Sequence, residues 1–219
     1  MNDERRNQRL RLLIRRFNKE RKRQAKQIDI LCNDLIAAQK HFVKALKVIG
    51  FAADFYEAIM GLTEPNDLLG TASNLIKDQV QDANIAFFLL SDGTFEMHIF
   101  ESEQPIDLLG PGGATGENSR IENFFTFELV ETIAQSNRIC TVEDMLTMGL
   151  SINPLHLEKI SAVCVPLNHH GSSLGFVLLY RSNSSPFTPQ ELQSIDHVSP
   201  GLARAIASCR SLASITQPL

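Results

Sequence analysis

The chain has 219 residues, 43% of them hydrophobic, which is enough for one well-buried domain with an extension and too little for two large domains. No apolar stretch approaches the roughly 18 residues of a membrane-spanning helix, and no apolar signal-peptide core follows the first residues, so we expect a cytoplasmic protein. The charge is asymmetric, because residues 1–27 carry eleven Lys or Arg against three acids and the remainder carries ten against twenty-two. This basic N-terminal segment predicts either an acidic partner or contact with the acidic body of its own assembly.

A long amphipathic helix is predicted from about Glu4 to about Met60, because apolar residues recur there at steps of three or four. The spacing is typical of a coiled-coil seam, and the polar seam residues Arg21 and Gln24 weaken it where the charge is densest. We therefore predict that residues 1–44 form a basic N-terminal coiled coil and that the chain is a parallel homodimer. The predicted dimerisation residues lie where the seam is most apolar: Ile28, Leu31, Leu35, Phe42 and Ile49.

The main domain is predicted at residues 45–212, with a short tail at 213–219. After the end of the long helix, a second helix begins at the candidate cap Thr63, and strands and helices follow it. A stretch at 109–120 has four glycines and a proline, matches neither common phosphate-binding motif, and is predicted to be a loop. The predicted elements are a helix to Gln81, strands at 83–90 and 95–101, a helix at 123–137, a strand at 138–142, strands at 161–168 and 174–181, and a helix from Thr188 through Pro200 to Leu212.

A histidine pair, His169 and His170, lies at the tip of the second predicted hairpin. Consecutive side chains of an extended backbone point to opposite faces, and no further ligands follow at the spacing of a zinc site. We therefore predict no metal site there. The four cysteines are widely separated and form no Cys-x-x-Cys pair, which favours reduced thiols over a disulfide framework.

Three phrases of the chain resemble the GAF domain family. They are ELVETIAQSNRICTVED at 128–144, SAVCVPL followed by LGFVLLY between 161 and 180, and SPFTPQELQSIDHVSPGLARAI near the end. The resemblance implies an α+β domain, in which an antiparallel sheet of five or six strands has helices on both faces and follows the long N-terminal helix. An apolar sheet face needs such a cover on physical grounds as well.

The resemblance implies a non-catalytic regulatory module, which senses a small molecule or a partner protein and transmits through a dimeric helical bundle. If the chain is complete, its output passes through a separate protein. A cavity is expected between the sheet and the helix at 123–137. No cofactor is specified, and the Cys-His dipeptide that attaches bilin in many GAF domains is absent. The candidate pocket residues are Phe124, Phe125, Glu128, His156, Cys164 and Tyr180.

Two other functions remain open from the sequence. Some GAF-like proteins reduce free methionine sulfoxide with cysteines, and Cys140 and Cys164 are candidates for that reaction, although the glycine-rich loop lacks the family's cysteine. Thiols on apolar strands also tend to be inert, so we predict no enzyme activity. The basic N-terminal segment is also suited to nucleic acid or another anionic surface, but a solvated coiled-coil face explains its charge more simply.

Overall fold

In a computed structural model of the chain, the described residues are 2–91, 93–102, 120–152 and 157–216. The chain divides into two compact units, Met1–Lys47 and Val48–Leu219. The first helix, α1 (Asn2–Ile59), supplies the whole described part of the first unit and the beginning of the second. The predicted glycine-rich loop lies outside the described residues, except for Arg120.

The second unit is built on a five-stranded antiparallel sheet in the order β2-β1-β5-β4-β3, which confirms the predicted fold class. Both predicted hairpins are present, with β1 paired to β2 and β4 paired to β5, each across a short turn. The strands are β1 (Asn84–Ser91), β2 (Thr94–Phe100), β3 (Cys140–Thr141), β4 (Ile160–His169) and β5 (Ser172–Ser182).

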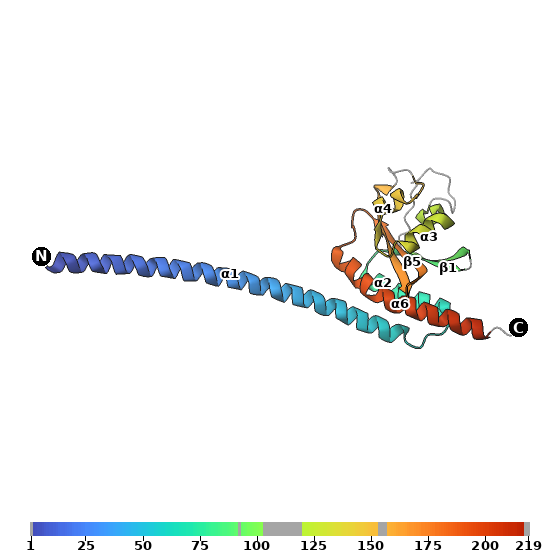
Figure 1. The fold of residues 1–219 in the computed structure, drawn as a ribbon, viewed down its shortest axis with the longest axis horizontal. Coiled ribbons are helices and arrows are strands. Elements are labelled where there is room, and N and C mark those ends of the chain that lie inside the picture. The colour runs from blue at the N-terminus through green and yellow to red at the C-terminus, as the bar shows by residue number, and fades with distance from the viewer. Residues whose placement is uncertain (1, 92, 103–119, 153–156, 217–219) are drawn as a thin grey trace. The chain divides into compact units, whose positions relative to one another are not determined.

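Helices cover both faces of this sheet (Figure 1). On one face α2 (Pro65–Gln79) and α6 (Pro189–Thr216) pack with the end of α1, and on the other face α3 (Phe127–Gln135) and α4 (Val142–Thr147) form the cover. Neighbouring strand residues therefore enter different cores. Val163 lies in the core beneath α2 and α6, whereas Cys164 lies in the core beneath α3.

Several helix boundaries differ from the sequence prediction. The helix predicted from residue 123 begins at Phe127, because the Thr126 side chain caps it, and a short 3₁₀ turn, η2 (Ile121–Phe124), precedes it. The predicted strand at 138–142 is reduced to the two residues of β3. Thr141 instead begins α4 through a capping box with Asp144, which the sequence analysis missed. The residue before α2 is Glu64, not the predicted Thr63.

The closing helix α6 begins as predicted, with reciprocal hydrogen bonds between Thr188 and Glu191. Glu191 also accepts two hydrogen bonds from the buried guanidinium of Arg181, which fixes the start of α6 to β5. The helix continues through Pro200, which has no N–H to donate to the carbonyl of Asp196. The Ser199 hydroxyl donates to that carbonyl over 3.0 Å.

The last turns of α1 pack against α6 within the second unit. Phe55 is fully buried, and the Tyr56 hydroxyl donates to the His197 carbonyl of α6 over 3.0 Å. The Tyr56 ring also lies directly over Gly201, where an added Cβ would come within 1.9 Å of the ring. The absence of a side chain at residue 201 therefore permits this close approach of the two helices.

A second close approach occurs inside the sheet at Gly175 of β5. Its φ is +133°, and an added Cβ would lie 1.8 Å from the carbonyl oxygen of Phe88 on β1. The pairing of β4 with β5 shifts register at this end of the hairpin, between Leu167 and Asn168. Only glycine satisfies both the backbone angle and the spacing.

Candidate functional site

The core between the sheet and α3 contains three of the six predicted pocket residues. Phe125, Cys164 and Tyr180 are buried in it, and Phe124 packs against its margin. Glu128 is exposed in the first turn of α3, where backbone and Thr126 hydrogen bonds lower the pKa of its carboxyl. His156 lies outside the described residues. The structure therefore brings four of the six candidates together.

Aromatic rings fill the centre of this core. Phe88 of β1 stacks on Phe176 of β5 at 4.8 Å between ring centroids, with an interplanar angle of 19°. Phe125 reaches the same cluster, with its centroid 4.8 Å from that of Phe88. Such pairs add about 0.5–1.5 kcal/mol beyond the burial of their surface. Phe125 thus contributes to packing, and the polar chemistry of this layer comes from other residues.

A buried carboxyl group, Glu122, is the main polar feature of this layer. Its Oε1 accepts a hydrogen bond of 2.5 Å from the Tyr180 hydroxyl, and the residue is only 2% exposed. Its Oε2 is buried without a partner among the described residues. Burial raises the pKa of Glu122 even though the hydrogen bond from Tyr180 lowers it, and burial together with the nearby carboxylate raises the pKa of Tyr180.

The sequence analysis selected Glu128 and missed Glu122. Each follows an apolar residue in the same short stretch, and the distant strand β5 distinguishes them, because Tyr180 reaches Glu122 from there. Next to this pair, the Arg120 guanidinium forms an ion pair with Glu101 at the end of β2. A ligand group that donates a hydrogen bond would satisfy the unpartnered Glu122 oxygen.

The buried carboxyl predicts a dependence of stability on pH. In the folded state the Glu122 carboxyl keeps its proton at pH values above 4.5, its ordinary pKa. In the unfolded state it loses the proton near pH 4.5. The free energy of unfolding should therefore fall as pH rises from 4.5 through the raised pKa. Glu122→Gln should make this decline shallower in urea unfolding measured between pH 4.5 and neutrality. The exposed Glu143→Gln is the control, and equal slopes for wild type and Glu122→Gln would contradict this assignment.

Two buried thiols belong to this core. Cys140 of β3 pairs in register with Cys164 of β4, and both side chains are fully buried. Burial raises the pKa of the Cys164 thiol well above its ordinary range, and the thiol donates to the Met145 sulfur over 3.5 Å. A protonated, enclosed thiol is a weak nucleophile.

The histidine pair occupies the turn of the β4–β5 hairpin. The two rings lie 4.2 Å apart between centroids, and His170 has a φ of +49°, so the backbone bends at this residue. No group of three or more His, Cys, Asp or Glu side chains gathers at metal-binding distances among the described residues.

A cavity of about 680 Å³, which the sequence analysis did not predict, opens on the other side of the sheet. It lies between the start of α2, the β1–β2 hairpin and the end of α6. Arg210 partly closes it by donating to the Leu90 carbonyl over 2.7 Å, while its second terminal nitrogen is buried without a partner in the described chain. The lining residues are Pro65, Asn66, Leu68, Leu69, Leu89, Leu90, Ser91, Glu96, His98, Ile206, Cys209 and Arg210.

The predicted seam of α1 is exposed in the single chain. Its five dimerisation residues are between 58% and 66% exposed, which is unusual for apolar side chains so regularly spaced. The same helix is not apolar enough to cross a bilayer, and this holds for every helix of the described residues. The seam therefore presents an apolar surface to solvent or to a partner.

Comparisons with known proteins agree with this architecture. A model of the GAF domain matches residues 64–206. The GAF domain of a phosphoenolpyruvate-protein phosphotransferase from Coxiella burnetii is 13% identical, with a TM-score of 0.54, and the match covers 78% of this chain and 98% of that one. The corresponding domain from Acinetobacter is 13% identical, with a TM-score of 0.53 and coverage of 77% and 98%. No curated protein matches the sequence.

Proposed function

This chain belongs to the GAF domain family, and from that membership we propose that it is a non-catalytic regulatory module. It senses a small molecule or a partner protein in its folded body and passes the response to its terminal helices. The site proposed for the sensed group is the layer between the sheet and α3, with Glu122 added to the residues that the sequence suggested.

The observation that carries this proposal is the shared packing of both terminal helices on one side of the sheet. The end of α1 and most of α6 contribute to a single buried core with β1, β4 and β5. Tyr56 joins the two helices directly through its hydrogen bond to the His197 carbonyl. A change in the sheet therefore reaches both helices at once.

The strands connect this core to the candidate site. On β4, Val163 faces the helical core and the next residue, Cys164, faces the candidate site. Protein cores are densely packed, so a displacement on one face of a strand shifts contacts on the other. A ligand acts through such a path only if it binds the two helix arrangements with different affinities.

Enlarging Cys164 tests this coupling. Cys164→Phe should overpack the layer beneath α3, at a cost of about 1–3 kcal/mol, and should alter hydrogen exchange in the last turns of α1 and in residues 109–120. Val163→Phe enlarges a side chain in the core beneath α6. Its hydrogen-exchange pattern therefore shows what a direct disturbance of α6 produces. If Cys164→Phe stays folded and changes exchange in neither segment, the site is not coupled to the helices, and the body is an inert scaffold for dimerisation.

We propose that the module is a parallel homodimer held through α1. The exposed seam from Ile28 to Ile49 supports this, because pairing it with a second copy would remove its apolar surface from water. A native mass spectrum of protein purified from its own host would report the subunit number and any bound small molecule together. The output of such a dimer would go to a separate partner protein.

The buried thiols support a non-catalytic role. Cys164 is fully enclosed and its pKa is raised, so it has little thiolate to attack a sulfoxide. Incubation with free methionine sulfoxide should leave all four thiols titratable. Loss of two thiols to a disulfide would favour the reductase-like function instead.

A further inference from the structure

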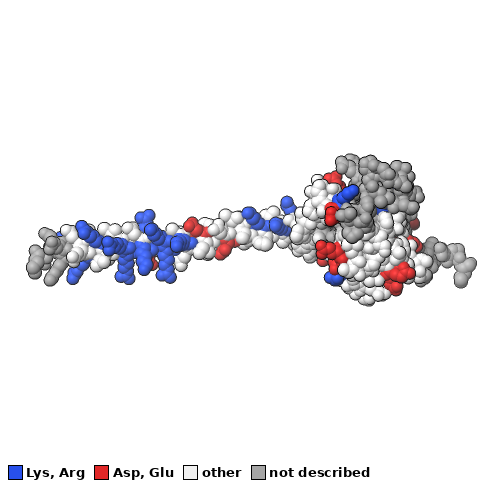
Figure 2. Space-filling view, turned by 90° about the horizontal axis from the view of Figure 1, so that it is seen from above, with Lys and Arg blue, Asp and Glu red and all other residues white. Residues whose placement is uncertain are grey.

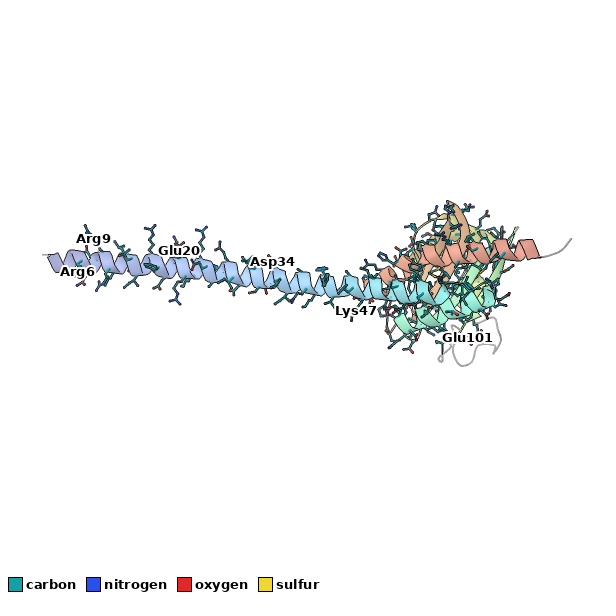
Figure 3. All side chains as sticks on the ribbon, turned by 90° about the horizontal axis from the view of Figure 1, so that it is seen from below. Arg6, Arg9, Glu20, Asp34, Lys47 and Glu101 are labelled. Carbon is teal, nitrogen blue, oxygen red and sulfur yellow. The ribbon has the colours of Figure 1, made fainter. Side chains whose placement is uncertain are left out.

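The N-terminal part of α1 is strongly basic and exposed. Residues 6–27 contain ten Lys or Arg and a single acid, Glu20, and every side chain among them is exposed. Figure 2 shows the Lys and Arg side chains gathered over this part of the helix, and Figure 3 labels Arg6, Arg9 and Glu20 on it. We call residues 6–27 the basic arm.

Four apolar side chains of the basic arm share one side of the helix. At 3.6 residues per turn, the spacing of Leu10, Leu13, Ile14 and Phe17 places them within an arc of about 100°. They are 56%, 53%, 52% and 69% exposed, respectively. Together they form a compact apolar face slightly more than two turns long.

The cations occupy the remaining circumference. The same helical geometry places eight of them on the side away from the apolar face, while Arg6 and Arg21 lie one turn before and after it. Leu12 is the exception, an apolar residue 64% exposed on the basic side. The eight cations of the basic side are Arg9, Arg11, Arg15, Arg16, Lys19, Lys22, Arg23 and Lys26.

Two polar residues lie between the apolar face and the most apolar part of the proposed dimer seam. A strict heptad counted back from Ile28 passes through Gln24 and Arg21 before it reaches the apolar face, so two polar residues interrupt it. Three residues of that face lie on the continued heptad: Phe17, Ile14 and Leu10. Leu13 lies beside that heptad and not on it. Two copies paired along the arm would also bring twenty like charges together, which opposes pairing.

We propose that the basic arm binds the surface of membranes that contain anionic lipid, lying parallel to the bilayer with its apolar face among the acyl chains. The charge distribution matches this occupant, because the flanking cations reach lipid phosphates while the apolar residues enter the interface. Long Arg and Lys side chains extend their charged ends toward the headgroups. Nucleic acid would engage the cations but would leave the four apolar side chains exposed.

Two adjacent leucines about 100° apart around the helix provide a matched test, because Leu13 belongs to the apolar face and Leu12 to the basic side. Full-length protein should sediment with phosphatidylcholine vesicles that contain phosphatidylserine and should remain in solution with phosphatidylcholine alone. Leu13→Gln should weaken binding to the anionic vesicles about tenfold, which is the contribution of one buried leucine. Leu12→Gln makes the same chemical change on the basic side and should bind as wild type does.

Insertion can be observed directly, because the chain contains no tryptophan. Phe17→Trp should show a blue-shifted emission and protection from an aqueous quencher when anionic vesicles are added. Leu12→Trp should remain open to the quencher. Sedimentation equilibrium of both variants without lipid identifies any shielding that arises from pairing of two chains.

Three results would overturn the proposal. The first is equal vesicle binding by Leu12→Gln and Leu13→Gln, and the second is no binding to anionic vesicles at all. The third is protection of the Phe17→Trp side chain from the quencher, either by duplex DNA or in the free protein, to the same extent as by vesicles. The third result would assign the arm to nucleic acid or to a second copy of the chain.

Discussion

Gly175→Ala is expected to prevent the body from folding stably. The new methyl group would lie 1.8 Å from the Phe88 carbonyl oxygen, and the contacting atoms are backbone atoms of the neighbouring strand, which cannot rotate away. The backbone angle of +133° adds strain for any residue with a side chain. We expect a loss of at least about 4 kcal/mol in the free energy of unfolding, measured by urea denaturation.

Gly70→Ala is the matched control in the same unit. Gly70 lies inside α2, and nothing lies within 4 Å of an added Cβ. Alanine there should stabilise the helix by about 0.5–1 kcal/mol. If Gly175→Ala were as stable as wild type, the close approach of β5 to β1 would be wrong.

Leu35→Asp is expected to dissociate the proposed dimer. In a parallel pair the substitution buries two carboxylates where two leucines would otherwise meet, and each leucine loses its apolar contacts. The dissociation constant should rise by a factor of at least about 100, from the burial of two leucine side chains alone. Sedimentation equilibrium over a range of protein concentrations measures this change.

Ile30→Asp makes the same kind of change at a residue of α1 that lies away from the seam. Ile30 is 60% exposed, close to the 62% of Leu35, so the two substitutions differ mainly in the side of the helix that they alter. It should leave the association unchanged. Wild-type protein that is monomeric at tens of micromolar, a range typical of weak association, would remove the basis for the dimer.

The hairpins and terminal helices could be predicted because their signals are local. The two-residue period of an extended strand fixes which side chains of β4 share a face, and it places Val163 and Cys164 in different cores. The capping box at Thr188 likewise depends on residues three apart. Such patterns need no knowledge of distant contacts.

Other features depend on contacts that the sequence does not display. The burial of Glu122 is set by Tyr180 on a distant strand, and the cavity beside Arg210 forms where three separate elements meet. The helix α4 did have a local signal, the capping pair of Thr141 and Asp144, but with six residues it shows no periodicity. The seam of α1 stays a prediction, since a single chain displays only its exposure.

The close contact between Tyr56 and Gly201 implies an evolutionary constraint on two residues that lie far apart in the sequence. A side chain at residue 201 would occupy the volume of the Tyr56 ring, so lineages that replace this glycine should also carry a smaller residue at 56. Such a replacement would at the same time remove the hydroxyl that bonds to the His197 carbonyl. Covariation between these two positions would therefore mark the relatives in which α1 and α6 are held together by the same contact.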